Sequence, residues 1–165
     1  MERSGILWSI KTILMADKRR EATFTSFDSE HQHNFDEKGR LILPARLRES
    51  IGNKCVLSKG MEGCIDVYPL EAWTKLEEKL ELLSDFNRRN RDFKRRFFSG
   101  SEPCDVDKQG RILIKQEFRN YANLTKEVYI VGVGNHMQVW DKEAWEDYRG
   151  GLDESFESLA EEIFQ

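Results

Sequence analysis

Two nine-residue stretches of the chain share one pattern, FDEKGRLIL at residues 35–43 and VDKQGRILI at residues 106–114. Each reads as an apolar residue, an aspartate, two polar residues, a glycine, an arginine and three branched apolar residues. The copies lie 71 residues apart, and the likeness continues downstream, where Leu47-Arg48 matches Phe118-Arg119. Repetition at a fixed spacing is typical of a duplicated structural unit. The sequence therefore predicts two copies of one unit.

Each copy predicts a tight turn that leads into a short strand. An aspartate at the start of a turn can accept hydrogen bonds from free backbone N–H groups, and a glycine supplies the positive φ that tight turns require. The apolar triplets that follow, residues 41–43 and 112–114, predict short buried strands. Brief helical segments are expected next, at residues 44–50 and 115–121.

A β-hairpin is predicted in the second half of each unit. Its strands are expected at residues 54–58 and 64–68 in the first unit, and at residues 127–133 and 136–140 in the second. So few short strands cannot enclose a core alone. We therefore expect the two units to pack together around a pseudo-two-fold axis.

Helices are predicted between the units and after the second one. Apolar residues at helical spacing define two linking helices separated by Ser84-Asp85, and an amphipathic stretch follows Gly150-Gly151. The residues that define them are Trp73, Leu76, Leu80 and Leu83, then Phe86, Phe93 and Phe97, and last Leu152, Phe156, Leu159 and Ile163.

Composition excludes several classes of protein. With 39% hydrophobic and 34% charged residues, the chain is predicted to be soluble and globular, and no apolar run reaches the length of a membrane span. Its three cysteines are widely spaced, which suits a reducing cytoplasm rather than a disulfide framework. The first residues include an apolar stretch that could be a weak signal sequence. A disordered or mis-started extension, with Met15 as the alternative first residue, is the simpler interpretation.

The net charge of −4 hides an uneven distribution of charge. Residues 141–165 hold nine acidic and two basic residues, which leaves the first 140 residues at +3. Residues 88–96 hold six basic side chains among nine. The overall acidity therefore does not exclude a nucleic-acid partner, because the acidic excess belongs to the tail.

The arginines of the repeated turns are the leading candidates for a binding site. A guanidinium presents a planar fork of donors that suits guanine O6 and N7 as well as phosphate oxygens. Arg40 and Arg111 could instead pair with Asp36 and Asp107 and only lock the turns, and both roles are compatible. Lys38 is expected to contact phosphate or to remain solvated. A metal-dependent nuclease built on the two aspartates is disfavoured, because each arginine would compete with the cation.

Other charged residues favour structural roles. Helical spacing spreads the basic side chains of residues 88–96 around the helix, which favours pairing with acidic neighbours such as Glu77, Glu78 or the tail over auxiliary phosphate contact. Arg48 recurs as Arg119, which favours a role in the fold or an interface. His31 and His33 alternate along a strand without an obvious third metal ligand, and the glycines of residues 132–137 lie in a hairpin, so no metal, cofactor or nucleotide site is predicted.

The motifs together resemble the MraZ family, which belongs to the AbrB-like, double-split β-barrel group of bacterial transcription factors. The resemblance covers residues 27–148 and is strongest at residues 36–44, 107–114 and 124–132. It implies an α+β fold in which a duplicated β-rich unit forms a double-split (AbrB/MazE-like) β-barrel, with linking and C-terminal helices. The sequence departs from the family pattern at Ser29, where a glycine is more common.

The resemblance also implies a division of the chain. The implied segments are an N-terminal extension (1–26), a first AbrB-like repeat with its helix (27–84), an Arg/Phe-rich linking helix (85–100), a second AbrB-like repeat (101–148) and an acidic amphipathic tail (149–165).

A function follows from the same resemblance. Members of the family bind direct repeats in the promoter of the division and cell-wall gene cluster, usually as repressors, and assemble into rings. Their Asp-x-x-x-Arg turns face double-stranded DNA, which points here to Asp36, Lys38, Arg40, Asp107 and Arg111. The expected protein is thus a cytoplasmic, nucleoid-associated homo-oligomer and not an enzyme, with no cofactor, membrane or small-molecule partner. The alternative is an antidote-type interaction module whose C-terminal tail binds a partner protein.

Overall fold

The computed structural model describes residues 26–165 of the chain. Residues Ser26–Lys142 form one compact unit that contains strands β1 to β8, and the residues from Glu143 onward belong to a second unit, described by itself below. The predicted leader and the alternative start at Met15 lie outside the described residues. No helix in the described range is long and apolar enough to cross a membrane.

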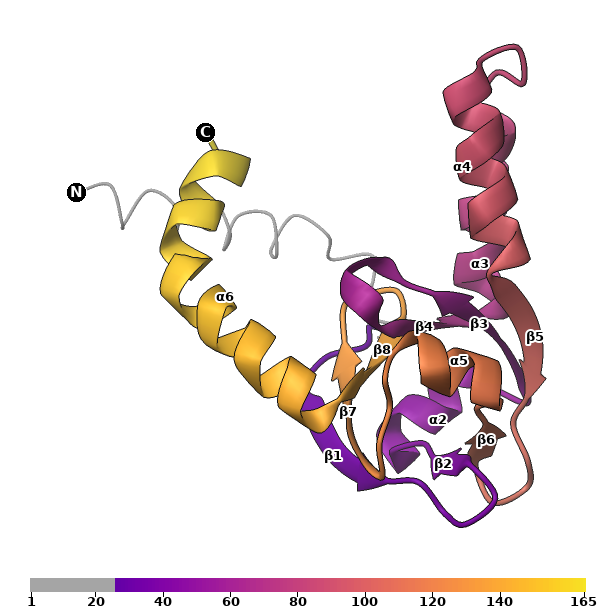
Figure 1. Cartoon of the computed structure of the whole chain (residues 1–165), viewed down its shortest axis with the longest axis vertical. Coiled ribbons are helices and arrows are strands. Elements are labelled where there is room, and N and C mark those ends of the chain that lie inside the picture. Colours follow the sequence, from indigo (N-terminus) through magenta and orange to yellow (C-terminus); the bar gives the residue numbers. More distant parts are fainter. Residues whose placement is uncertain (1–25) are drawn as a thin grey trace. The chain divides into compact units, whose positions relative to one another are not determined.

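Figure 1 shows the elements of the chain. The strands are β1 (Glu30–Asn34), β2 (Arg40–Ile42), β3 (Lys54–Lys59), β4 (Ile65–Pro69), β5 (Ser101–Asp105), β6 (Arg111–Leu113), β7 (Glu127–Gly132) and β8 (Met137–Asp141). The helices are α2 (Ala45–Ile51), the 3₁₀ turn η2 (Met61–Gly63), α3 (Leu70–Glu81), α4 (Arg88–Ser99), α5 (Gln116–Tyr121) and α6 (Lys142–Ile163). Both predicted hairpins are present, as β3–β4 and β7–β8.

The strands form one six-stranded antiparallel sheet and one two-stranded ribbon. The order in the sheet is β1-β7-β8-β4-β3-β5, and β2 pairs with β6 in the ribbon. The ladder of hydrogen bonds does not continue from β5 to β1 within residues 26–165, so these strands do not form a closed barrel. Instead, the ribbon contacts both outer strands, since β2 packs on β1 and β6 packs on β5 (Figure 1).

A pseudo-two-fold axis relates the two repeats, as the sequence predicts. In the ribbon Leu41 pairs with Ile112, its own counterpart in the second repeat, while Arg40 pairs with Leu113 and Ile42 with Arg111. The β4–β8 pair has the same symmetry about Asp66 and Gln138, with Ile65 opposite Val139 and Val67 opposite Met137. Both interfaces therefore join equivalent strands of the two repeats.

The two repeats share one core. The side chains of Leu41, Ile65, Ile112 and Val139 are fully buried in a single cluster that draws on both repeats. Neither hairpin could bury these residues alone, because β4 of the first repeat and β8 of the second are neighbouring strands that pair with each other. The duplicated α+β unit is thereby confirmed.

One prediction about the apolar triplets is wrong. Leu41 and Leu43 are buried, but Ile42 between them is 45% exposed, and Leu113 in the second triplet is 47% exposed. Side chains alternate between the two faces of a strand, so the middle residue of each triplet must point away from the core.

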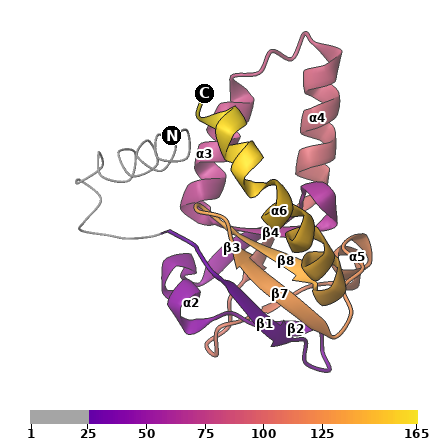
Figure 2. The same ribbon diagram turned by 90° about the vertical axis from the view of Figure 1, so that its left-hand side faces the viewer.

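The linking helices project from the sheet as a helical hairpin (Figures 1 and 2). Trp73 on α3 stacks on Phe97 of α4 with ring centroids 5.4 Å apart, and Leu80 is buried. The predicted helices were too long at the tip of this hairpin. Leu83 follows the end of α3, and Phe86 precedes α4 and is 99% exposed.

The start of α4 has a local cause. Asn87 caps the helix, because its side-chain oxygen accepts hydrogen bonds from the backbone N–H groups of Arg89 at 2.9 Å and Asn90 at 3.4 Å. Asparagine is a preferred residue at this position, and its extended backbone excludes Phe86 from the helix.

Helix α6, which from Glu143 onward belongs to the second unit, runs without a break through Gly150 and Gly151, where the sequence predicts a separate amphipathic stretch. Neither glycine has a positive φ. A glycine inside a helix costs about 1 kcal/mol relative to alanine, which the flanking helix-forming residues can offset.

Candidate nucleic-acid interface

The first repeated turn is held by the carboxylate of Asp36. Its Oδ1 accepts hydrogen bonds from the backbone N–H groups of Lys38 and Arg40, each at 2.9 Å. Its Oδ2 accepts a hydrogen bond from Nε of Arg40 at 2.7 Å. The carboxylate thus fixes both the backbone of the turn and the guanidinium that follows it.

The second turn repeats this geometry almost atom for atom. Oδ1 of Asp107 accepts hydrogen bonds from the N–H groups of Gln109 at 2.9 Å and Arg111 at 2.8 Å, and Oδ2 accepts one from Nε of Arg111 at 2.8 Å. The structure therefore brings four of the five predicted site residues into two equivalent Asp–Arg pairs.

The same donors keep both aspartates ionised. The backbone N–H of Arg40 lowers the pKa of Asp36 below its ordinary value, with further lowering by the Arg40 side chain. The N–H and side chain of Arg111 lower the pKa of Asp107 in the same way. Because the ion pair engages Nε, the terminal nitrogens of each guanidinium remain outside it and can take a ligand.

Both arginines lie on the outer face of the β2–β6 ribbon. Residues directly opposite each other in an antiparallel pair share a face, as do residues i and i+2 of one strand. The register therefore places Arg40, Ile42, Arg111 and Leu113 on one face, and Leu41 and Ile112 on the buried face. The arginine side chains are 30% and 27% exposed. They are neither on opposite sides of the ribbon nor fully buried.

Each turn is supported by an arginine from the other repeat. Arg48 donates a hydrogen bond from Nη1 to the carbonyl of Gln109 at 2.7 Å, and its side chain covers Gly110. Arg119 covers Gly39 in the equivalent position. This pairing confirms that the repeated arginine serves the fold.

The glycines of the turns meet two requirements at once. Gly39 and Gly110 have φ of +79° and +76°, a region that favours glycine. Their carbonyls accept hydrogen bonds across the ribbon, from Ile114 N–H at 3.1 Å and Leu43 N–H at 2.9 Å. A Cβ at Gly110 would lie 2.1 Å from Cδ of Arg48.

Lys38 is exposed at the tip of the first turn. The second turn carries Gln109 at the position of Lys38, but Lys108 is exposed one position earlier and was not among the predicted site residues. The signal was present in the sequence, since FDEKGR and VDKQGR each hold one lysine and one arginine.

Three of the six basic side chains of residues 88–96 pair with nearby acids. Lys94 contacts Asp85 at 2.8 Å, while Arg95 and Arg88 contact Asp92 at 3.1 Å and 3.7 Å. Arg96 instead lies over the ring of Tyr121, 5.5 Å from its centroid. Pairing with acids was the favoured interpretation, but the partners are Asp85 and Asp92 rather than Glu77 or Glu78.

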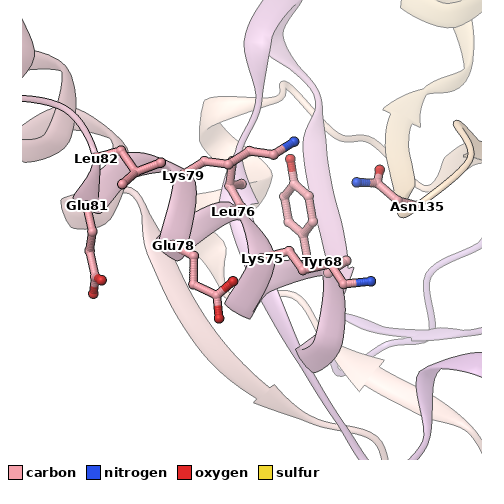
Figure 3. A pocket seen from close by; sticks show the side chains of 9 residues that line it. Tyr68, Lys75, Leu76, Glu78, Lys79, Glu81, Leu82 and Asn135 are labelled. Atoms are coloured by element: carbon pink, nitrogen blue, oxygen red, sulfur yellow. The ribbon is translucent and has the colours of Figure 1, made fainter.

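A separate groove of about 590 Å³ lies along α3. Figure 3 shows the ring of Tyr68 between the α3 side chains and Asn135. None of the five predicted site residues lines this groove. His31 and His33 lie in β1, and no group of three metal-ligating side chains occurs within residues 26–165.

Comparison with known proteins decides the family. The sequence profile of the family described as "MraZ protein, putative antitoxin-like" matches residues 26–96 and again residues 97–165. The chain belongs to the MraZ family. The double match is the duplication seen in the structure.

Individual members of the MraZ family are similar over most of the chain. "Transcriptional regulator MraZ" of Pelotomaculum thermopropionicum is 50% identical over 83% of this chain and 94% of the relative. The protein of the same name from Desulforamulus reducens is 47% identical over 83% of this chain and 96% of the relative. The solution structure of PHS018 from Pyrococcus horikoshii is 13% identical and aligns with 67% of this chain and 94% of that one at a TM-score of 0.30, too low to indicate a shared fold. Membership of the MraZ family makes the chain a transcriptional regulator rather than an enzyme.

Proposed function

We propose that the chain binds promoter DNA through the outer face of the β2–β6 ribbon. The observation that carries this proposal is the pair of equivalent Asp–Arg turns, which the pseudo-two-fold axis brings to one face. The major groove of double-stranded DNA is wide enough to admit a two-stranded β-ribbon.

The five site residues have different roles in this proposal. Arg40 and Arg111 contact guanine edges or phosphates with their terminal nitrogens, and Lys38 contacts phosphate. Asp36 and Asp107 act through the arginines, because their oxygens already accept hydrogen bonds from the turns. Lys108 joins Lys38 as a second phosphate contact.

The biological role follows from the family. We propose that the chain regulates, usually as a repressor, the division and cell-wall gene cluster through direct repeats in its promoter. It would act in the cytoplasm, on the nucleoid, as a homo-oligomeric ring that needs no cofactor, membrane or small-molecule partner. One ribbon offers few cationic contacts, so useful affinity at physiological salt requires several ribbons bound at once.

The test uses Arg40→Ala and Arg111→Ala in the full chain. The probe is a duplex selected by the wild-type chain from a randomised library. Each substitution should weaken binding by about 1–3 kcal/mol if the arginine makes a bidentate contact with guanine. Arg95→Ala removes the same charge from α4, outside the ribbon, where the arginine pairs with Asp92, and this variant should bind normally. Unchanged binding by Arg40→Ala, with fold and oligomer intact, would reject the site.

A second candidate is supported by α6. Phe156 and Ile163 are 68% and 72% exposed, and Leu159 lies on the same side of the helix. A row of exposed apolar side chains could bind a partner protein, as the C-terminal tail of an antidote-type module does. The variant Phe156→Ser/Ile163→Ser should then bind the selected duplex normally but lose a protein co-purified with the wild-type chain. Loss of DNA binding by this variant would reject the candidate.

A further inference from the structure

The outer face of the ribbon is half apolar. Ile42 and Leu113 share this face with Arg40 and Arg111, and each arginine has an aliphatic neighbour directly across the ribbon. The two arginines occupy one diagonal of this four-residue patch, and Ile42 and Leu113 occupy the other. At 45% and 47% exposed, neither aliphatic side chain belongs to the core, whose ribbon face is made by Leu41 and Ile112.

The repeats agree at this position although they differ nearby. Glu37 and Lys38 of the first turn are replaced by Lys108 and Gln109 in the second, yet both repeats place a large aliphatic residue two positions after the arginine. A polar residue would satisfy the alternation of the strand equally well. An exposed apolar pair beside two cations therefore points to a ligand surface that is both apolar and electronegative.

We infer that Ile42 and Leu113 contact thymine methyl groups in the major groove and so contribute to base specificity. The inference rests on the proposed function. The thymine C5-methyl group is the apolar feature that base edges present in that groove, next to the acceptors of guanine that suit arginine. Thymine is thus the base whose major-groove edge matches an aliphatic side chain beside a guanidinium.

The dimensions of the ribbon agree with this assignment. Side chains directly across an antiparallel pair lie roughly 5 Å apart, which is between one and two steps of about 3.4 Å along a DNA strand. Ile42 beside Arg111 therefore reaches a base within two steps of the arginine's contact. Leu113, which lies beside Arg40, is related to Ile42 by the pseudo-two-fold axis. It therefore reaches a base within two steps of the contact made by Arg40, and the order of arginine and aliphatic residue along the DNA is reversed.

The test removes single methyl groups from the DNA. In the duplex selected by the wild-type chain, each thymine is replaced by deoxyuridine, which lacks only the C5-methyl group. At one or more positions near the guanines, wild-type affinity should fall about fourfold per methyl group, as expected for one buried methyl. In Ile42→Ser or Leu113→Ser, the affinities for the thymine and uracil duplexes should become equal at the position that each side chain contacts.

Control variants and other outcomes keep the test decisive. Leu82→Ser removes an 86% exposed leucine at the tip of the helical hairpin and should retain the full uracil penalty. The inference is overturned if deoxyuridine has no effect at any position or if the penalty persists in the Ile42→Ser/Leu113→Ser variant. It is also overturned if that variant loses its oligomeric state, because the pair would then cover a second copy of the chain.

The same measurements separate this inference from the proposed function. If the wild-type chain selects no duplex, the proposed function fails and the inference fails with it. If binding depends on Arg40 but not on any thymine methyl group, the ribbon binds DNA and the inference alone is wrong.

Discussion

Ser29 adopts a backbone conformation that favours glycine. Its φ is +66°, and its carbonyl accepts a hydrogen bond from the N–H of Gly132 at 2.9 Å, which holds that conformation in place. For residues other than glycine, the left-handed region costs about 1–2 kcal/mol. The departure from the family pattern at this position therefore carries strain.

Ser29→Gly should stabilise the chain. Relief of the strain outweighs the greater freedom that glycine gives the unfolded chain, so we expect the free energy of unfolding to rise by about 0.5–1 kcal/mol. Urea denaturation of the full chain measures the change. Ser29→Ala keeps the strain, removes the hydroxyl and should not stabilise. An equal gain in both variants would show that the backbone conformation is not the cause.

The turn aspartates predict a loss of stability in acid. Their pKa values are lower in the folded chain than the ordinary value of 3.8, so their contribution is complete above that pH and is lost as the pH falls through the lower folded values. Between pH 7 and pH 2, wild-type stability should fall more steeply below pH 3.8 than that of Asp36→Asn/Asp107→Asn. The stability of the double variant should still depend on pH to some extent, because lysine partners lower the pKa values of Asp85 and Glu117. Parallel curves for the two proteins would contradict the assignment.

Individual residues of the site could be predicted where local chemistry dictates them. The Asp, Gly and Arg of each turn have a structural role that short-range geometry fixes, and the sequence alone predicted the tight turn and offered the Asp–Arg pairing as one of two roles. The outward direction of Ile42 could not be predicted so simply. Three branched apolar residues in a row show no alternation, and only the pairing of β2 with β6 decides which of them faces the core.

At the scale of elements, the ribbon depends on contacts between the repeats. Two hydrogen bonds join the first repeat to the second turn. Leu43 N–H donates to the Gly110 carbonyl, and the Arg48 side chain donates to the Gln109 carbonyl. Hairpins and helices were predictable from turn residues and periodicity, but this exchange of arginines was not, because its partners lie 61 residues apart. The start of α4 was missed for a different reason, since Asn87 was not recognised as its cap.

Gly110→Ala should destabilise the ribbon. A Cβ there meets both a positive φ and the side chain of Arg48, so we expect a loss of about 1–2 kcal/mol in the free energy of unfolding. Gly39→Ala should cost somewhat less, because its Cβ would lie 3.1 Å from Cζ of Arg119 rather than in collision with it. Urea denaturation compares the two variants.

Two further variants separate the causes. Arg48→Ala in the Gly110→Ala background relieves the collision but not the strain, so stability should recover only in part. Gly150→Ala, in the interior of α6, should instead stabilise by up to about 1 kcal/mol. If Gly110→Ala and Gly150→Ala had the same effect, the geometry described for the turn would be wrong.

At the scale of the whole molecule, charge and symmetry decide how DNA can be bound. The first 140 residues carry +3 and the remainder −7, so a single chain has little long-range attraction for DNA. Composition predicted this division of charge. The number of chains in the proposed oligomer could not be predicted, because it depends on surface contacts that no repeat in the sequence specifies. Under the proposed function, affinity must therefore come from several ribbons that bind together.

This requirement can be tested with two duplexes, which carry one copy or three copies of the box, the DNA sequence that the wild-type chain selects. The three copies are spaced by one helical turn of about 10.5 base pairs. Linked binding events gain affinity through effective concentration, so the full chain should bind three boxes at least about a hundredfold more tightly than one. The dependence of log affinity on log salt concentration should also become steeper, since its slope grows with the number of phosphates neutralised. Arg40→Ala should reduce the slope on three boxes by more than on one, because each ribbon loses a contact. Equal affinities and equal slopes on the two duplexes would mean that one ribbon suffices, and the proposed ring would then have no role in recognition.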